Sequence, residues 1–197
     1  LVVDGDATKM KWVLFLSVNP GGVTGGSGTQ FFIGEWNGKE FIADDVTNRW
    51  LDYGRDNYAG VTFTDAPNNR RIYLGWMSNW EYAKEIPANP ARGSMTIPRE
   101  LSLATIDGEI TLLQNPVKEI SGSAIIDRTF TITPTDSKSG LRFTSDDGRS
   151  FEVGYDPQSK KIYIDRANAW YPINSTPIHT APFDGRGNSF EIRVITD

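Results

Sequence analysis

The sequence lacks several features on which common classes of function depend. None of its 197 residues is a cysteine, which excludes disulfides and thiolate metal sites and leaves the cellular compartment open. It has one histidine, His179, so a histidine-based metal cluster is excluded. A Ser-His-Asp triad has weak support because no serine nucleophile motif lies near that histidine. Nothing in the sequence calls for a metal or an organic cofactor.

Charge of one sign is not concentrated anywhere, and long apolar runs are absent. The 20 Lys and Arg residues and 25 Asp and Glu residues are interspersed, with a net charge of −5. Because a nucleic-acid surface needs a basic patch or stripe, we expect no nucleic-acid partner. The longest apolar runs, such as residues 12–16, are too short to cross a bilayer, so we expect no membrane partner.

Short β-strands, by contrast, are indicated along nearly the whole chain. Residues 11–18 form an apolar run rich in β-formers. Residues 29–41 predict a hairpin, because an Asn-Gly pair, Asn37 and Gly38, separates two strand-like runs. Only residues 79–86 could form a helical turn, which the prolines that follow would end. We therefore predict an all-β fold. The remaining strand patterns lie at residues 69–79, 93–104, 109–115, 123–133, 139–156 and 160–166.

The composition changes near residues 112–120. All but one of the six tryptophans precede this segment, together with many glycines. Alternating strands with Thr, Ser and charged faces follow it, with a single tryptophan, Trp170. The change indicates a boundary between an aromatic-rich module and a more ordinary sandwich. Since the chain opens on Leu1 rather than Met and closes within an alternating stretch, we expect a piece of a longer protein.

Residues 19–30, NPGGVTGGSGTQ, are dense in glycine. Glycine permits positive φ and the close approach of a ligand or another backbone. A phosphate-binding loop is excluded, because the Walker lysine is absent and a strand rather than a helix follows. Two interpretations remain: a long hairpin loop, or a loop lying against a ligand to which Thr29 and Gln30 offer polar groups.

Residues 50–60, WLDYGRDNYAG, place Asp52, Arg55 and Asp56 among aromatic rings. Such combinations recognise sugars, since C–H faces stack on aromatic rings while hydroxyl groups bond to charged donors and acceptors. A solvated turn with a surface ion pair explains the pattern equally well.

A second aromatic and polar segment covers residues 75–95, where Trp76 and Trp80 are four residues apart. Trp80 lies between Asn79 and Glu81, so a stacking face, an amide and a carboxylate occur together. The alternative is that these tryptophans belong to a core, which is the commoner role of such rings.

Glycosidase chemistry would need two carboxylates that flank one bond, about 5 Å apart for retention of configuration. Only Asp52, Asp56 and Glu81 lie in aromatic settings. Nothing in the sequence marks any of the three as a nucleophile or as an acid.

Three segments together resemble glycoside hydrolase family 32, the levanases, inulinases and invertases that hydrolyse β-fructofuranosides: residues 12–41, 50–63 and 75–103. Residues 112–120 are similar to the family's junction between its catalytic propeller and its C-terminal sandwich. The resemblance implies a five-bladed β-propeller followed by a β-sandwich. Residues 1–114 would then be the C-terminal part of the propeller, and residues 115–197 a truncated sandwich.

The same resemblance implies where catalysis would lie. The family places an Asp nucleophile in a Trp-Met-Asn-Asp-Pro-Asn motif, a stabilising Asp in Arg-Asp-Pro, and an acid/base Glu in Glu-Cys-Pro. None of these motifs occurs here. In the family's order all three carboxylates would precede Leu1, so we expect no catalytic residue in this chain and no hydrolysis by the isolated chain.

What the resemblance assigns to this chain is the wall of a fructose pocket. Trp80 would be the stacking ring, while Trp76 would pack within its blade. The implied substrate-binding residues are Thr29, Gln30, Asp52, Arg55, Asn79 and Trp80.

Three hypotheses follow. The chain is part of a retaining β-fructofuranosidase, a non-catalytic carbohydrate-binding β-module, or a purely structural fragment. The expected partners are a β-fructoside (sucrose, inulin or levan) and the missing N-terminal portion of the propeller.

Overall fold

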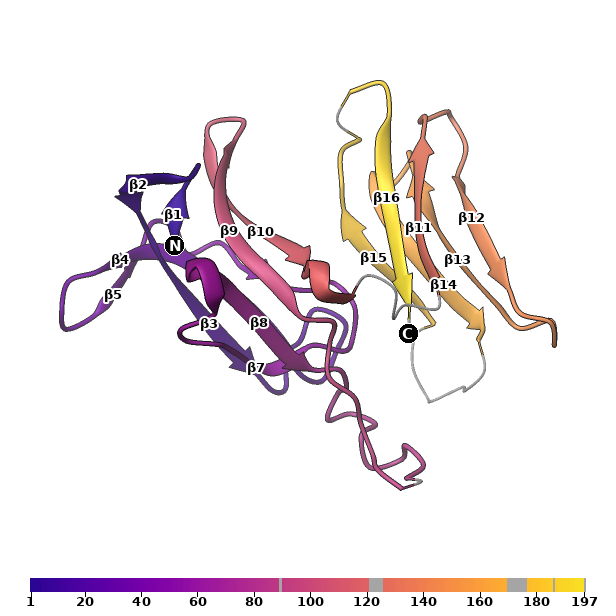
Figure 1. Ribbon diagram of the computed structural model, residues 1–197. Helices are drawn as coiled ribbons and strands as arrows, with labels where there is room; N and C mark the ends of the chain where they lie inside the picture. Colours follow the sequence, from indigo (N-terminus) through magenta and orange to yellow (C-terminus); the bar gives the residue numbers. More distant parts are fainter. Residues whose placement is uncertain (89, 121–125, 170–176, 186, 197) are drawn as a thin grey trace. The chain divides into compact units, whose positions relative to one another are not determined.

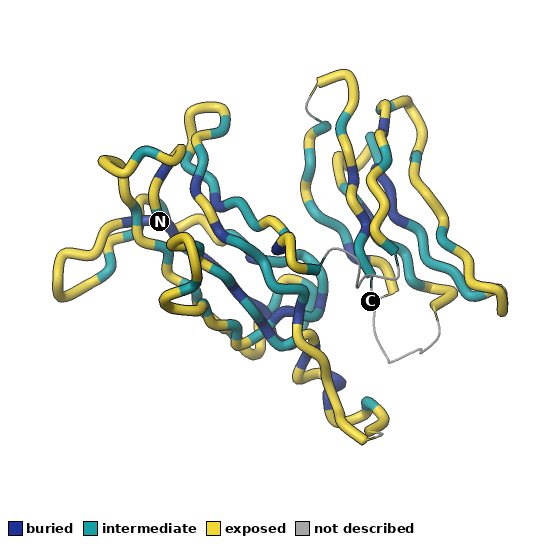
Figure 2. The backbone as a smooth tube through the Cα atoms, in the orientation of Figure 1, coloured by how far each residue is buried: buried dark blue, intermediate teal, exposed yellow. Residues whose placement is uncertain are grey.

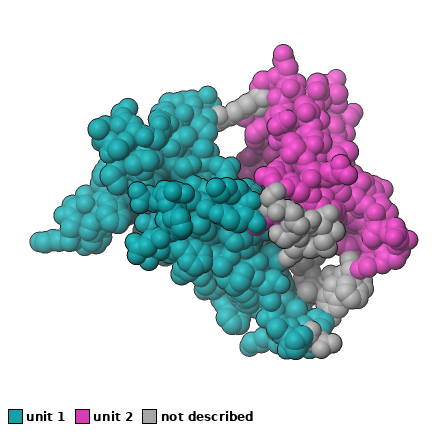
Figure 3. All heavy atoms as spheres, viewed as in Figure 1, with its two compact units in different colours: residues 1–119 teal, residues 120–197 magenta. Residues whose placement is uncertain are grey.

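The computed structural model describes residues 1–197 except 89, 121–125, 170–176, 186 and 197 (Figure 1). The chain forms two compact units, Leu1–Glu119 and Ile120–Asp197, which Figure 3 distinguishes by colour. In the described ranges the regular structure is β-strand, with two short 3₁₀ turns, η1 (Pro67–Asn69) and η2 (Lys118–Ile120). The predicted all-β class is confirmed. None of the helical segments described is long and apolar enough to cross a membrane.

The larger sheet of the first unit has the strand order β2-β1-β9-β8-β7, with β10 paired to β9. Its pairs are antiparallel except for β1 with β9, which run parallel at Val3 and Leu103. The strands and their bounds are β1 (Val2–Val3), β2 (Asp6–Met10), β7 (Tyr58–Thr62), β8 (Arg71–Trp76), β9 (Arg99–Ile106) and β10 (Glu109–Pro116).

The second sheet of this unit is built on a long hairpin. Its strands are β3 (Trp12–Val18), β4 (Gly28–Trp36), β5 (Phe41–Ala43) and β6 (Arg49–Trp50), with β4 paired to each of the others. The predicted turn at Asn37 and Gly38 joins β4 to β5, and Gly38 has a φ of +94°. An Asn-Gly pair suits this place because the turn needs a positive φ.

The core of the first unit lies between its two sheets. Phe15 on β3 pairs with Phe31 on β4, and Val13 pairs with Ile33, so alternate side chains of the hairpin reach the core. Tyr73 from β8 is fully buried among them. The other face of β3 is largely uncovered, since Trp12, Leu14 and Leu16 are exposed, and Figure 2 colours the residues of β3 as exposed or intermediate. The buried core residues are Val3, Phe31, Ile33, Leu51, Tyr73, Leu101, Leu103 and Leu112.

The second unit is a β-sandwich. One sheet pairs β11 (Ile126–Ile132) with β16 (Phe190–Thr196). The other has the order β12 (Ser139–Thr144), β13 (Ser150–Asp156), β14 (Lys161–Asn168) and β15 (Ile178–Pro182). Side chains from both sheets form a single core, which gives the unit its own hydrophobic interior. Its buried members are Ile132, Val153, Tyr155, Ile192 and Val194.

The compact units divide after Glu119, whereas the domain boundary implied by the resemblance, after residue 114, stays a prediction about the family's domains. Trp170 and residues 123–125 of the predicted strand 123–133 lie outside the described residues. The segment 79–86, where the sequence allows a helical turn, forms turns in which Tyr82 and Ala83 donate backbone hydrogen bonds to the Asn79 carbonyl.

Candidate functional site

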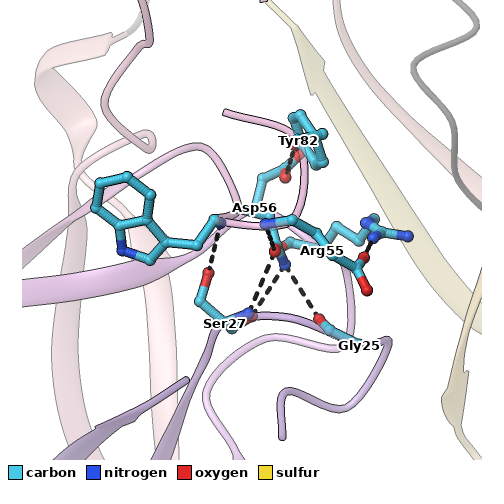
Figure 4. Close-up of polar contacts among 8 residues, drawn as sticks. Gly25, Ser27, Arg55, Asp56 and Tyr82 are labelled. Carbon is cyan, nitrogen blue, oxygen red and sulfur yellow. Dashed lines mark hydrogen bonds and ion pairs between the residues drawn. The ribbon is translucent and has the colours of Figure 1, made fainter. Parts of the chain in front are cut away.

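Three segments that are far apart in the sequence meet at one side chain. The Gly-rich loop leads into β4, the segment 50–60 follows β6, and Asn79 follows the end of β8. Asn79 is fully buried and bonds to the backbone of both other segments, as Figure 4 shows for Gly25, Ser27 and Arg55.

Backbone groups of the protein satisfy the whole hydrogen-bonding capacity of the Asn79 amide. Nδ2 donates to the carbonyl oxygens of Gly25 (3.2 Å), Ser27 (3.1 Å) and Arg55 (3.0 Å). Oδ1 accepts from the backbone N–H of Ser27 (3.2 Å) and of Glu81 (2.9 Å). Since a primary amide has two donor hydrogens and two acceptor lone pairs, no capacity remains for a sugar hydroxyl.

Trp80 has the opposite character. Its backbone N–H donates to Ser27 Oγ (3.1 Å), while the residue as a whole is 49% exposed. Its ring centroid lies 5.1 Å from that of Trp76, which in turn lies 6.4 Å from Tyr58. Trp76 is therefore packed between two rings. Trp80 combines a fixed backbone with an accessible apolar surface, which is what stacking on a sugar face requires.

Arg55 is a buried cation held by protein groups. Its side chain is 5% exposed and forms an ion pair with Glu81, whose side chain is half exposed. The guanidinium lies 5.6 Å from the centre of the Tyr82 ring, and the Tyr82 hydroxyl donates to the Asp56 carboxylate (Figure 4). A buried charge requires such partners, because removing it from water is otherwise costly. Arg55 and Asp56 thus tie the segment 50–60 to the turn after Trp80.

Asp52 belongs to a separate network. Its carboxylate accepts from Arg99 on β9 (2.7 Å) and from the Gly54 backbone N–H (3.2 Å). Arg99 also donates to Gln114 Oε1 (3.0 Å), and Gln114 donates to the Leu51 carbonyl (2.8 Å). Asp52 and Arg55 are therefore each paired with another residue rather than with one another.

Thr29 and Gln30 lie on opposite faces of β4. Thr29 is 2% exposed, and its hydroxyl donates to the Asn57 carbonyl (3.1 Å). Gln30 is partly exposed on the other face, where it pairs with Leu16 and Trp50. Because consecutive strand residues point to opposite sides, the two side chains do not face one common hollow.

A buried polar layer lies next to Thr29. The Tyr73 hydroxyl donates to Asn57 Oδ1 (2.7 Å), and Asn57 is 2% exposed. Burial raises the pKa of the Tyr73 hydroxyl, so the group stays protonated at neutral pH. Through Asn57, this layer joins the residue before β7 to β4 and β8.

Sequence reasoning did not select Ser27 or Arg99, both of which hold expected site residues in place. Ser27 is 3% exposed and bonds to Asn79 and Trp80. Its position inside the Gly-rich loop was the only available signal. Arg99 lies 47 residues from Asp52 in the sequence, and no local pattern marks such a pair.

The three carboxylates considered for glycosidase chemistry each have a protein donor. Asp52 binds Arg99, Asp56 binds Tyr82, and Glu81 binds Arg55. The last two interactions tie the segment 50–60 to the turn after Trp80, whereas the first ties it to β9. The chemistry that the described residues offer at this place is apolar stacking on an accessible ring, supported by a rigid polar frame.

The chain resembles known proteins along its whole length. The description "Glycosyl hydrolases family 32 N-terminal domain" matches residues 1–116, and "Glycosyl hydrolases family 32 C terminal" matches residues 95–197. A levanase of Bacillus subtilis (strain 168) is 34% identical over 233 residues, covering 100% of this chain and 34% of the levanase. An extracellular exo-inulinase of Meyerozyma guilliermondii is 33% identical, covering 81% of this chain and 38% of the inulinase.

Solved structures of an exo-inulinase and a beta-fructofuranosidase also resemble the whole chain. An exo-inulinase from Aspergillus awamori has a TM-score of 0.82 at 28% identity, covering 100% of this chain and 46% of the inulinase. A beta-fructofuranosidase from Schwanniomyces occidentalis, complexed with fructosyl-erythritol, has a TM-score of 0.76 at 25% identity and is 48% covered. These neighbours join a β-propeller to a β-sandwich, which confirms the predicted architecture.

The chain thus spans about a third of the length of the curated relatives above, and just under half of the solved ones. The N-terminal family description alone matches more than half of the chain, and a 34% identical levanase aligns with all of it. The chain therefore belongs to glycosyl hydrolase family 32.

Proposed function

We propose that this chain forms part of the sugar-binding wall of a retaining β-fructofuranosidase that hydrolyses fructosyl bonds in sucrose, levan or inulin. The observation that carries the proposal is the exposed Trp80 ring on a rigid polar frame, in a chain whose relatives include a levanase and exo-inulinases. The beta-fructofuranosidase neighbour with fructosyl-erythritol supports the same substrate class.

In this proposal Trp80 contacts the sugar, and most of the other expected wall residues support the pocket wall without contacting the sugar. Asn79 and Thr29 are buried and bonded to backbone carbonyls, so they support the wall without reaching a ligand. Asp52 and Arg55 hold their segments through ion pairs. Gln30 keeps a partly exposed amide that is able to bond to a hydroxyl.

The reacting carboxylates would come from a portion of the protein that precedes Leu1. Retaining hydrolysis needs a nucleophile and an acid/base about 5 Å apart. The involvement of Asp52, Asp56 and Glu81 with Arg99, Tyr82 and Arg55 supports a framework role for these three. The described residues would contribute orientation of the substrate rather than proton transfer.

Hydrolysis by the isolated chain tests this division of labour. We expect no release of reducing sugar from sucrose, inulin or levan, whereas the longer protein with the upstream portion releases it. Turnover that persists in the isolated chain after purification to homogeneity, and that a Trp80→Ala variant loses, would overturn the assignment of the reacting groups to another portion.

A non-catalytic carbohydrate-binding β-module is the second candidate. The observation that favours it is the same accessible ring combined with carboxylates that are all engaged by protein donors. Calorimetric titration of the isolated chain with fructo-oligosaccharides separates the two. Binding by the isolated chain, together with a longer protein that binds but does not hydrolyse, would favour the module.

A further inference from the structure

We infer that Asn79 is a positioning residue that clasps the Gly-rich loop to the turn bearing Trp80, and is not itself a sugar ligand. The importance of Asn79 for substrate binding rests on the proposed function. The clasp itself is a statement about the loop, the turn and the segment 50–60, and it is testable without any substrate.

Bonds run in both directions between the loop and the turn. The Asn79 side chain makes two hydrogen bonds to the Ser27 backbone. Its Oδ1 accepts from the Ser27 N–H (3.2 Å), and its Nδ2 donates to the Ser27 carbonyl (3.1 Å). Ser27 Oγ in return accepts from the Trp80 backbone N–H (3.1 Å). The side chain of each segment therefore binds the backbone of the other, which fixes the distance and the angle between the two (Figure 4).

Gly26 explains part of the glycine content of this loop. Its φ is +61°, and a Cβ built at this position would overlap the Asn79 amide, with all three nearest atoms belonging to Asn79. A side chain here would therefore push the amide away from Ser27 as well as strain the backbone. The Gly-rich loop is shaped to receive the Asn79 side chain, so the two positions depend on each other.

The same amide fixes both ends of the ion pair between Arg55 and Glu81. Nδ2 donates to the Arg55 carbonyl (3.0 Å), while Oδ1 accepts from the backbone N–H of Glu81 (2.9 Å). The guanidinium of Arg55 and the carboxylate of Glu81 are thereby brought together from two different segments. Asn79 thus joins three segments whose members are 24 to 54 residues apart in the sequence.

A double-mutant cycle tests the clasp. The variants are Gly26→Ala, Asn79→Ala and both together, and the measurement is the urea midpoint followed by tryptophan fluorescence. Gly38→Ala is the matched control, since Gly38 also has a positive φ (+94°) but no atom within 4 Å of the added Cβ. The fluorescence reports mainly on the first unit, because all tryptophans except Trp170 lie there.

We expect Gly26→Ala to lower the midpoint by about 0.5–1 M more than Gly38→Ala does. In the Asn79→Ala background this excess should vanish, because the overlapping amide is gone. Gly38→Ala should lower the midpoint equally in both backgrounds. Additive effects of Gly26→Ala and Asn79→Ala would overturn the inference.

Hydrogen exchange read at single amides provides an independent measurement, and it separates positioning from general stability. In Asn79→Ala the Ser27 and Glu81 amides should exchange at least tenfold faster, while Asn37→Ala, which removes a similar acceptor at Lys39 and Glu40, should leave both unchanged. Unchanged exchange at Ser27 and Glu81 in Asn79→Ala would contradict the clasp.

Ser27→Ala provides a milder variant if Asn79→Ala does not fold. It should speed exchange at the Trp80 amide and raise acrylamide quenching of Trp80, measured as the difference from a Trp80→Phe background. An unchanged Trp80 amide would contradict the return bond from Ser27. Neither outcome depends on fructoside binding, so failure of the clasp and failure of the proposed function can be told apart.

Discussion

Trp80 shows how a single residue can be both fixed and accessible. Its backbone N–H donates to Ser27 Oγ and its ring packs against Trp76, yet 49% of the residue remains in contact with solvent. A large ring normally gains most by complete burial. A ring held half-exposed by polar bonds behind it is preorganised for a ligand face, since little conformational freedom remains to be lost on binding.

We predict that Trp80→Ala in the longer protein lowers kcat/KM for a fructoside by about tenfold or more. The physical reason is the loss of ~1–3 kcal/mol of stacking and burial in the transition state. Trp80→Phe, which retains an aromatic face, should lose much less. Steady-state kinetics with sucrose or inulin provides the measurement, and equal kcat/KM for wild type and Trp80→Ala would remove Trp80 from the pocket.

The Arg55–Glu81 pair yields a prediction about stability. Glu81→Gln leaves the buried guanidinium without its counter-charge and should lower the unfolding free energy by about 1–2 kcal/mol, less than for a fully buried pair because Glu81 is half exposed. Glu85→Gln removes a charge from the same turn at an exposed position and should have little effect. Urea titrations of both variants decide, and similar midpoints for the two would show that the pair contributes nothing.

At the scale of elements, β3 has apolar side chains on both faces. Val13 and Phe15 pack against the core, whereas Trp12, Leu14 and Leu16 are 58%, 41% and 46% exposed. A strand that is apolar on both sides is typical of a sheet covered on both faces. We therefore predict that β-structure from the expected N-terminal portion of the propeller covers this face in a longer protein.

We predict that Leu14→Lys in the isolated chain reduces binding of the dye ANS and reduces self-association, because a charge interrupts the exposed apolar stripe. The same substitution should impair folding of the longer protein, where the stripe would be covered. Leu141→Lys, at an exposed position of β12 in the second unit, is the control. ANS fluorescence and size-exclusion chromatography are the measurements, and unchanged dye binding would mean that the stripe is not the accessible apolar surface.

The elements were predictable from sequence to the extent that local rules govern them. Short runs rich in β-forming residues predicted the strands, and Asn37-Gly38 predicted the hairpin turn, because both signals lie within a few neighbouring residues. The roles of Asn79 and Asp52 were not predictable this way. Their partners are 52 and 47 residues away at Ser27 and Arg99, and only the folded chain brings these groups together.

The family resemblance gave the architecture but a coarser picture of the site. It grouped six residues as the lining of a pocket, whereas the structure separates them by exposure and by bonding. Trp80 is half-exposed, while Asn79, Thr29 and Arg55 are buried with protein partners. A motif records which residues recur together, and it does not distinguish a residue that touches a ligand from one that holds its neighbour in place.

For the molecule as a whole, acid should weaken the first unit through Arg70. This guanidinium binds Glu100 (2.8 Å) and both carboxylate oxygens of Glu119 (2.5 and 3.0 Å), so it fixes the segment near η2 to β9. The hydrogen bonds from Arg70 lower the pKa of Glu119 from 4.5 to about 2. A depressed carboxyl pKa contributes stability above the unfolded value, and that contribution disappears as the pH falls through the folded value.

We therefore predict that the unfolding free energy of the first unit falls as the pH drops from about 4.5 to about 2, and that Glu119→Gln makes this fall less steep. Urea midpoints of wild type and variant, measured by tryptophan fluorescence at several pH values, provide the check. Asp127→Asn serves as the control, because its pKa is also lowered by an arginine, Arg193, but within the second unit. Parallel pH profiles for wild type and Glu119→Gln would refute the assignment.

Among the residues that the structure describes, the two hydrophobic cores have no member in common. A substitution that loosens the packing around Tyr73 therefore leaves the contacts around Tyr155 intact, and the reverse also holds. During evolution, each unit can therefore accumulate substitutions in its core independently of the other. Recombination near residue 120 would therefore exchange the members of one core without dividing the other.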